Sequence, residues 1–336
     1  MGFAAEKEKT EKRVRKYKLV ALIVGVCMLA AIAVLGLFVQ PFGWKYYVML
    51  PSVAKRGAGE LRIHYVSVGQ GDATLVELPD GKVMLIDGGD GTEDANLALL
   101  RYINALQIET IDYLVATHAD ADHCGGLAEV LACKQVKRAF LPSVALDGKE
   151  DTADYKAYKA FYAALQREGC PKEFSRREIT LTSANARFPY TLAFLYPHTA
   201  EPDTDRSSND DSCVIWLDYH GTSALFTGDI SANVETAIIQ EYQNGLGKKD
   251  IDITDTEILK VSHHGSENAT GETFVKYLGV ETAVISCGKH NAYNHPSLTV
   301  LQTLLTCNVQ TYRTDIHGTV MLTLKQDGTY STKTFA

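Results

Sequence analysis

The sequence predicts an α/β fold: an αββα sandwich, in which two β-sheets pack face to face with helices outside, preceded by one transmembrane helix. Three observations lead to this prediction. A run of 21 residues near the N-terminus contains no charge. Beyond it, β-rich runs followed by helical patterns occur twice in the same order, which favours two packed sheets with outer helices. Histidine and aspartate residues gather directly after several predicted strands, where functional residues are often found.

The N-terminal 59 residues predict a membrane anchor. We expect a basic cytoplasmic tail at 1–18, a transmembrane helix at 19–39 and a juxtamembrane linker at 40–59. As a helix, the apolar run would cover about 30 Å of hydrocarbon. The basic flank before it predicts a single-pass protein of the cell membrane, with a cytoplasmic N-terminus and an extracytoplasmic domain. A cleaved signal peptide is the alternative, but its apolar core is usually only about 7–15 residues long.

Residues 60–336 predict one domain of strands and helices. An antiparallel meander opens it, strand and helix patterns then alternate, and a hairpin closes it. The predicted strands are Ile63–Val68, Ala73–Leu78, Val83–Ile86, Tyr113–Ala116, Ala139–Leu141, Thr191–Tyr196, Cys213–Tyr219, Ala224–Thr227, Ile258–Val261, Ala283–Ser286, Thr319–Leu324 and Thr329–Thr334. The predicted helices are Asn96–Leu106, Leu127–Ala132, Ala153–Arg167, Ala232–Tyr242, Glu272–Leu278 and one that His295-Pro296 opens and that ends at Leu305.

The composition is globular, and the charge balance restricts the function. With 336 residues, 46% hydrophobic and 22% charged, the chain is not disordered, collagen-like or a small disulfide-stapled protein. Residues 1–18 hold seven Lys/Arg and three Glu, so the net charge of -8 leaves -12 for the rest. This excludes a strongly basic nucleic-acid platform. It does not exclude a nucleic-acid substrate, because divalent cations reverse the local charge at a carboxylate-rich site.

The stretch from Thr117 to Gly126 carries the most informative cluster of polar residues. Four metal-capable side chains occur within six residues, directly after an apolar strand. Unpaired buried carboxylates are costly, and imidazole with carboxylate suits Zn²⁺ or Mn²⁺. The alternatives are a solvated loop or a Ca²⁺ loop, and the two imidazoles argue against Ca²⁺. The four residues are His118, Asp120, Asp122 and His123.

This motif, His-x-Asp-x-Asp-His, resembles the metal motif His-x-His-x-Asp-His of the metallo-β-lactamase fold, with Asp120 where the second His usually stands. The variant is similar to that of the ComEC-like branch, the competence (DNA-uptake) proteins, and of related choline-phosphate esterases. The resemblance implies a metallo-β-lactamase-like hydrolase domain at 60–336. ComEC carries a multi-helix channel, so transport of DNA by this chain is not implied. Other segments that match in the same order are Val68–Asp72, Leu85–Gly89, Asn209–Ser212, Leu225–Asp229, Ser262–Ser266 and Asn294–Pro296.

The resemblance also implies two divalent metal ions, Zn or Mn. The first would be held by His118, Asp120 and Asp229, and the second by Asp122, His123, Asp229 and His264. For Asp229 the alternative is a helix cap, and for the His263-His264 pair it is a solvated loop.

The third histidine ligand of the family is missing between Tyr196 and Cys213, where Asn209 and Ser212 stand instead. The first ion site is therefore poorer in imidazole and favours Mn²⁺. Asp87 is expected to orient ligands through hydrogen bonds, with an Asp-Gly turn as the alternative. His295 either contacts a substrate phosphate or is a loop residue before a proline.

A paired-metal site predicts hydrolysis. A metal ion lowers the pKa of its bound water from about 15.7 to about 7, and two cations can stabilise both oxygens of a phosphodiester displacement. We therefore expect a phosphodiesterase or nuclease that uses a metal-bound hydroxide, with DNA among its candidate substrates. Asp122 would orient the water, and His263 would bind metal or contact the leaving group. The alternatives are a β-lactam or lactone hydrolase, a choline-phosphate esterase and a non-enzymatic binding module with a structural metal.

Overall fold

The computed structural model describes residues 2–38, 43–144, 151–199 and 207–335. The chain divides into two compact units, Met1–Met49 and Leu50–Ala336. Residue 1 of the expected tail, residue 39 of the expected span and residues 40–42 of the expected linker lie outside the described residues.

The N-terminal unit consists of α1 (Gly2–Phe38) and the short 3-10 helix η1 (Gly43–Tyr47). Within α1, Glu8–Val34 is long enough to cross a membrane and contains an 18-residue window with a mean hydropathy of 2.4. Among the described residues this is the one candidate membrane span, as predicted. The helix begins earlier than predicted, because Lys, Arg and Glu in the basic tail are good helix formers and Lys12 pairs with Glu8 at 2.7 Å.

The second unit consists of strands that alternate with helices. Its strands are β1 (Leu61–Tyr65), β2 (Thr74–Glu77), β3 (Val83–Ile86), β4 (Thr110–Ile111), β5 (Tyr113–Val115), β6 (Gln135–Val136), β7 (Ala139–Leu141), β8 (Lys172–Phe174), β9 (Thr180–Thr182), β10 (Thr191–Tyr196), β11 (Val214–Tyr219), β12 (Thr222–Phe226), β13 (Ile258–Lys260), β14 (Thr282–Ile285), β15 (Gln310–Arg313), β16 (Thr319–Leu324) and β17 (Tyr330–Phe335). Its helices are α2 (Glu93–Ala105), α3 (Ala121–Cys124), α4 (Leu127–Cys133), α5 (Ala153–Glu168), η2 (Asn209–Asp211), α6 (Ala232–Gln243), η3 (Ser262–Gly265), α7 (Glu272–Leu278), α8 (Leu298–Thr306) and α9 (Thr314–His317).

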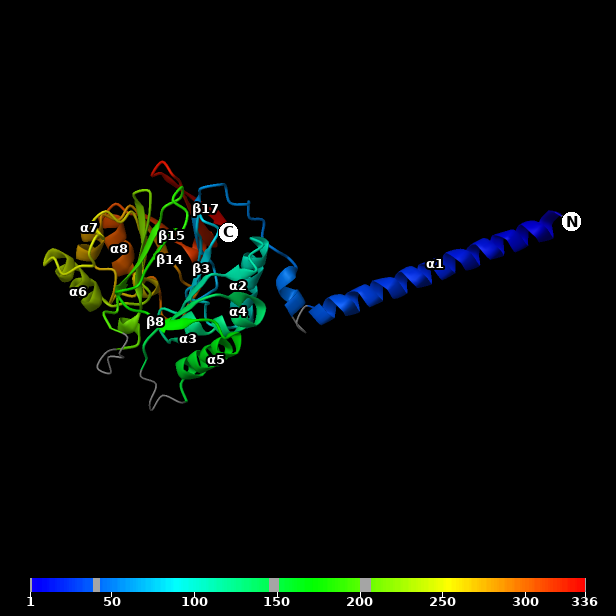
Figure 1. Ribbon diagram of the computed structural model, residues 1–336, viewed down its shortest axis with the longest axis horizontal. Helices are drawn as coiled ribbons and strands as arrows, with labels where there is room; N and C mark the ends of the chain where they lie inside the picture. The colour runs from blue at the N-terminus through cyan, green and yellow to red at the C-terminus, as the bar shows by residue number, and fades with distance from the viewer. Residues whose placement is uncertain (1, 39–42, 145–150, 200–206, 336) are drawn as a thin grey trace. The chain divides into compact units, whose positions relative to one another are not determined.

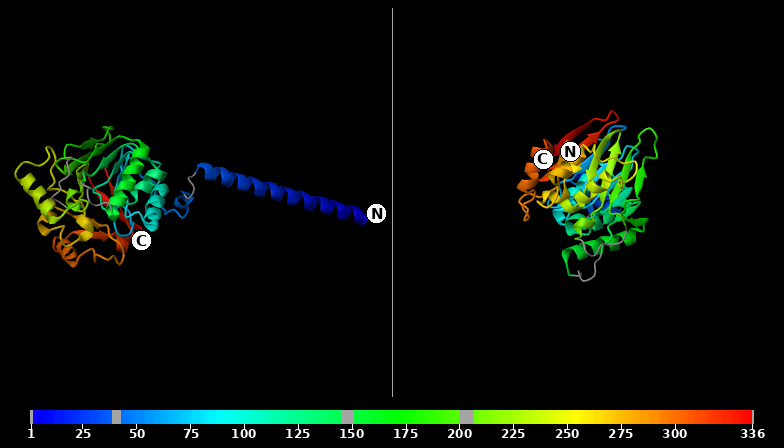
Figure 2. Two further views of the ribbon diagram at one scale, coloured as in Figure 1. Left: turned by 90° about the horizontal axis from the view of Figure 1, so that it is seen from below. Right: turned by 90° about the vertical axis from the view of Figure 1, so that its left-hand side faces the viewer.

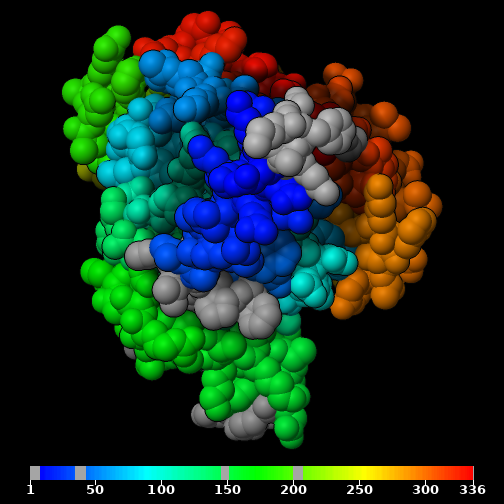
Figure 3. Space-filling view, turned by 90° about the vertical axis from the view of Figure 1, so that its right-hand side faces the viewer, coloured from blue at the N-terminus to red at the C-terminus, as the bar shows by residue number. Residues whose placement is uncertain are grey.

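The strands form two large sheets that pack face to face. The first has the order β17-β16-β1-β2-β3-β5-β7-β8 and the second β15-β14-β13-β12-β11-β10-β9. Helices α2, α4 and α5 lie outside the first sheet, and α6, α7 and α8 lie outside the second (Figures 1 and 2). The space-filling view places the cyan and green half of this unit opposite its orange C-terminal part (Figure 3). This is the predicted αββα sandwich.

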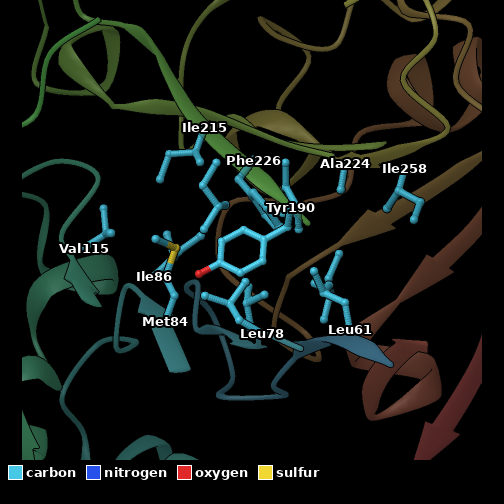
Figure 4. Packing of buried hydrophobic residues seen from close by; sticks show 14 of the residues in the cluster. Leu61, Leu78, Met84, Ile86, Val115, Tyr190, Ile215, Ala224, Phe226 and Ile258 are labelled. Atoms are coloured by element: carbon cyan, nitrogen blue, oxygen red, sulfur yellow. The ribbon is translucent and has the colours of Figure 1, made fainter. Parts of the chain in front are cut away.

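Apolar side chains from both sheets meet between them. In β1, Leu61, Ile63 and Tyr65 belong to this core, because alternate residues of a strand point to the same face. Met84 of β3 and Phe226 of β12 enter it from opposite sheets (Figure 4). A second core lies between the second sheet and helices α6, α7 and α8. Burial of both sheet faces therefore fixes the register of the strands.

Most predicted elements are present, and the differences have local causes. The strands β4, β6, β8, β9 and β15 were not predicted, because they have two to four residues and no clear alternation. The helix expected to open at His295-Pro296 begins instead at Leu298. Its N-cap is Ser297, whose hydroxyl accepts a hydrogen bond from Val300 N at 3.2 Å.

The two sheets bring several strand ends to one place. Strands β3, β5 and β7 are parallel in the first sheet, as are β12, β13 and β14 in the second. The carboxyl ends of parallel strands lie at the same edge of a sheet, where ligands usually bind. The loops after β3, β5, β12, β13 and β14 contain Asp87, His118, Asp229, His264 and Gly288.

Candidate metal centre

The loop after β5 is held by close backbone packing. It continues into α3, which carries Asp122 and His123. A Cβ atom at Gly126 would lie 2.1 Å from the carbonyl oxygen of Gly88, in the loop after β3. A larger residue there would clash with the backbone of Gly88, so the glycine allows the two loops to pack closely. This packing sets the distance between Asp87, in the loop after β3, and the histidines His118 and His123, which follow β5.

His123 lies at the centre of the site and is completely buried. Its Nδ1 donates to Asp87 Oδ2 at 2.8 Å, and its Nε2 lies 3.2 Å from Asp229 Oδ1. Asp87 also accepts from the backbone N–H of Thr117 at 2.8 Å. Burial opposes a charged imidazole, but Asp229 and Asp87 raise the pKa of His123 well above its usual value.

His264 approaches the same point from the second sheet. Its Nδ1 donates to the carbonyl oxygen of Ser286 at 3.0 Å, while Nε2 lies 3.2 Å from both Asp229 Oδ2 and Asp122 Oδ2. The Nε2 atoms of His264 and His123 are 3.3 Å apart. Against the effect of burial, Asp229 and Asp72 raise the pKa of His264. Two imidazoles and a shared aspartate thus converge from separate loops.

Asp72 completes a buried group of four possible metal ligands. The sequence analysis had not assigned Asp72 as a ligand. One ligand atom from each of Asp72, His123, Asp229 and His264 lies within 4.8 Å of the others. The backbone N–H of Asp72 donates to Asp122 O at 3.1 Å, so its loop packs against α3. The available signal was the acidic residue that ends the Gly69-Gln70-Gly71 loop.

Lys260 was also missed by the sequence interpretation. It is the last residue of β13 and is buried, and its Nζ contacts Asp72 Oδ2 and lies 3.8 Å from Asp229 Oδ1. Nζ also donates to Gly228 O at 3.3 Å. Although burial opposes a charged amine, Asp72 raises the pKa of Lys260. A lysine within an otherwise apolar strand was the signal for a buried partner of opposite charge.

His118 and Asp120 lie beside His123, and of the two only Asp120 is partly exposed. The rings of His118 and His123 are 4.1 Å apart, and His118 Nε2 lies 3.7 Å from Asp120 Oδ2. Burial, together with the neighbouring His123, lowers the pKa of His118 to about 4. His118 is therefore neutral and able to bind a metal at pH 7. Asp120 accepts a hydrogen bond from the hydroxyl of Ser208, a residue that the sequence interpretation had not assigned.

The remaining predicted residues lie around the rim. Asn209 Nδ2 lies 3.3 Å from His263 Nε2, which is 3.8 Å from Asp229 Oδ2. The hydroxyl of Ser212 accepts from the backbone N–H of Asp229 at 3.0 Å, so it fixes that loop. The ring of His295 lies 5.6 Å from that of His263.

His198 does not supply the missing imidazole. Its Nε2 pairs with Glu241 Oε1 at 2.8 Å, and its ring packs against Tyr196. Among residues 197–199 and 207–212, which the structure describes, no histidine therefore reaches the centre.

The residues present fit a divalent cation. His118 Nε2, Asp72 Oδ1 and Asp229 Oδ1 are buried and make no hydrogen bond to any described group. Such atoms are costly to bury unless a ligand satisfies them. The raised pKa values of His123 and His264 have the same origin, since protons there offset an excess of carboxylate charge. Imidazole nitrogen and carboxylate oxygen are ligands suited to Zn²⁺ and Mn²⁺.

Comparisons with known proteins agree with this arrangement. Residues 66–145 match the model of the Metallo-beta-lactamase superfamily, whose members are generally metallo-hydrolases. ComE operon protein 3 of Bacillus subtilis (strain 168) is 31% identical over 290 residues, which cover 82% of this chain and 34% of that protein. Recombination protein 2 of Haemophilus influenzae is 29% identical over 268 residues, 79% of this chain and 29% of that protein. Competence protein ComA of Neisseria gonorrhoeae is 25% identical over 317 residues, 91% of this chain and 39% of that protein.

The chain spans about a third of the length of these relatives. From the family match, the relatives and the fold together, the chain is a ComEC-like protein of the metallo-β-lactamase fold.

Proposed function

We propose that this protein is a membrane-anchored, metal-dependent phosphodiesterase whose substrates include single-stranded DNA. The observation that carries the proposal is the convergence of His123, His264 and Asp229 from separate loops, with buried ligand atoms that make no hydrogen bond to a described group. The apolar span in α1 would anchor the protein, and its basic flank would hold the N-terminus in the cytoplasm, leaving the hydrolase unit outside.

The charge of the site favours two divalent ions, Zn²⁺ or Mn²⁺. Five carboxylates and one ammonium group surround it, which leaves a formal charge of -4 with neutral imidazoles. Bound cations would polarise the phosphoryl oxygens and lower the pKa of a coordinated water. The residues that would hold one ion are His118, Asp120 and Asp229, and those for the other are Asp122, His123, Asp229 and His264.

In this proposal Asp122 orients a water molecule. Its side chain is 32% exposed, and one carboxylate oxygen lies 3.2 Å from His264 Nε2. Burial opposes ionisation, but the hydrogen bond from His264 lowers the pKa of Asp122 to about 2. The carboxylate is therefore ionised at pH 7 and accepts a hydrogen bond from water on its open side.

In this proposal His263 contacts the leaving group. Burial lowers its pKa, so the imidazole is neutral at pH 7. Asn209 Nδ2 donates to Nε2, which leaves the proton on Nδ1. The backbone of His263 has a φ of 49° and that of His264 a φ of 52°, conformations that non-glycine residues rarely adopt. This strained turn presents the two rings to different sides of the site.

A substrate panel tests the proposal. The full-length chain in detergent, supplied with Mn²⁺ or Zn²⁺, should release nucleotides from single-stranded DNA and p-nitrophenol from bis-p-nitrophenyl phosphate. Asp122→Asn should abolish both activities, whereas Asp250→Asn, at an exposed turn, should retain them. A metal-replete chain that hydrolyses no phosphodiester would contradict the proposal. Turnover of nitrocefin or of a choline-phosphate ester instead would assign one of the other hydrolases, and metal binding without any turnover would assign a binding module.

A further inference from the structure

The segment that follows β14 is locally basic in an otherwise acidic unit. From Thr282 to Thr314 there is no Asp or Glu, and the charged residues are Lys289 and Arg313. From Leu50 to the C-terminus the chain has 25 Lys/Arg and 38 Asp/Glu, a net charge of -13. This segment therefore repels an anionic substrate less than the unit as a whole does.

This segment lines a pocket of about 550 Å³. Its wall includes Lys289, His290, Asn294, His295 and Arg313, which are groups that donate hydrogen bonds to phosphate oxygens, and one carboxylate, Asp315, which pairs with Arg313. It adjoins a second pocket of about 500 Å³, whose wall includes the Gly69-Gln70 loop. That loop ends at Asp72 of the metal centre, so the two pockets flank the centre on one side.

The pocket is connected to the metal centre through His295. The His295 ring stacks on that of His264, with centroids 6.3 Å apart and planes inclined by 28°. Its Nδ1 is buried and makes no hydrogen bond to a described residue. Asn291 fixes the loop, because its side chain accepts from His295 N at 2.9 Å and donates to His295 O at 2.6 Å. A ligand in the pocket would thus contact the ring that packs against His264.

Two exposed side chains define what the pocket can bind. Lys289 is exposed and makes no ion pair with a residue that the structure describes, whereas Arg313 is held by Asp315 at 3.0 and 2.7 Å. Tyr293 does not line the pocket. It is 67% exposed and stacks on the wall residue His295, with ring centroids 5.7 Å apart and planes inclined by 25°. An unpaired cation in the wall and an exposed aromatic ring next to a wall residue suit a phosphate and a neighbouring nucleobase.

We propose that this pocket binds the nucleotide next to the scissile phosphodiester of a single-stranded polynucleotide. Lys289 contacts the phosphate of that nucleotide, and Tyr293 stacks on its base. The proposal rests on the phosphodiesterase function and adds a subsite to it. It makes the enzyme selective for oligonucleotides over diesters that have a single phosphate.

The test compares two substrates at several salt concentrations. With the full-length chain in detergent and Mn²⁺, KM is measured for an eight-residue oligothymidylate and for bis-p-nitrophenyl phosphate. Lys289→Gln should raise the ratio of KM for the oligonucleotide to KM for bis-p-nitrophenyl phosphate about tenfold, and Tyr293→Ala should do the same. Tyr293→Phe should retain the wild-type ratio. Lys289→Gln should also reduce the slope of log KM for the oligonucleotide against log salt by about 0.7, the loss of one phosphate contact on a single strand.

Lys325→Gln is the matched control. Lys325 is exposed and follows Leu324, which pairs with Leu61 at the start of β1, so it lies at the end of the sheet away from the metal centre. If the wild type hydrolyses both substrates and Lys289→Gln behaves like this control, the subsite is wrong and the phosphodiesterase function stands. Hydrolysis of the small diester alone would also overturn only the subsite. Hydrolysis of neither substrate would overturn both.

Discussion

The two loops that carry the imidazoles of the site are supported in different ways. In the loop after β5, Asp87 accepts directly from the imidazole of His123 and from the backbone of Thr117, both at 2.8 Å. At the loop after β13, Glu235 of α6 forms no hydrogen bond or ion pair with an imidazole of a described residue. It accepts from the backbone N–H groups of Thr270 and Gly271, at 2.6 and 3.0 Å. The Asp87 carboxylate therefore orients the imidazole of His123, whereas the Glu235 carboxyl fixes the backbone of the loop that carries His264.

This difference separates effects on metal binding from effects on stability. Asp229 lies between the two loops, with one oxygen 3.2 Å from His123 and the other 3.2 Å from His264. Lys260 is linked to both loops through Asp72 and Asp229. Substitutions at the shared residues Asp229 and Lys260 should thus have larger effects than substitutions at Asp87 or Glu235, each of which supports one loop.

The largest effect is expected for Asp229→Asn. The amide keeps the shape of the side chain but removes the charge that both histidines face. We expect kcat/KM to fall by at least about 1,000-fold, roughly 4 kcal/mol of transition-state stabilisation. Metal content, measured by elemental analysis after dialysis, should fall with it. Retention of full metal content would show that the two loops bind metal without their shared carboxylate.

Lys260→Met should have the next largest effect, a loss of unfolding free energy whose size depends on whether metal is bound. Without metal, the change leaves Asp72 buried without its ammonium partner, which should cost about 3 kcal/mol of unfolding free energy. With Mn²⁺ bound, the added cation compensates the carboxylate and the loss should be smaller. Urea unfolding followed by tryptophan fluorescence, in EDTA and in Mn²⁺, measures both values. The control is Lys134→Met, whose buried side chain pairs with Glu109 at 3.2 Å and whose cost should not depend on metal. Equal costs of Lys260→Met in the two buffers would contradict the prediction.

The fold and the β5 loop could be predicted because their signals are local. Alternating apolar residues reveal β1, a short apolar run between turn residues reveals β3, and the motif from His118 to His123 is contiguous. Asp72, Lys260 and Glu235 were not found, since their roles exist only when distant loops pack together. The short strands β8 and β9 were missed for a similar reason: in three residues, sheet pairing rather than local pattern decides the conformation.

Glu235→Gln tests the support of the second loop. Burial raises the pKa of Glu235 to about 7, against hydrogen bonds from Gly271, Thr270 and Ser262 that favour ionisation. Because the folded-state pKa lies above the unfolded value, the stability from this group is complete below pH of about 4.5 and is lost as the pH rises to about 7. The expected loss is about 3 kcal/mol. In EDTA, the difference in unfolding free energy between wild type and variant should shrink by this amount over that range. A difference that is constant with pH would show that Glu235 ionises at its ordinary pKa.

Asp87→Asn should have the smallest effect, and it should act on metal binding before stability. The amide can still accept a hydrogen bond from Thr117 N, but its donor group faces His123 Nδ1 and disfavours the tautomer in which Nε2 is free to bind metal. Loss of such an outer hydrogen bond typically lowers metal affinity by about 10–100-fold. Titration calorimetry with Mn²⁺ measures this loss, and the unfolding free energy in EDTA serves as the control. If Asp87→Asn instead shifted the pH dependence of unfolding while leaving metal affinity intact, it would act as Glu235 does, and the distinction between the two loops would not hold.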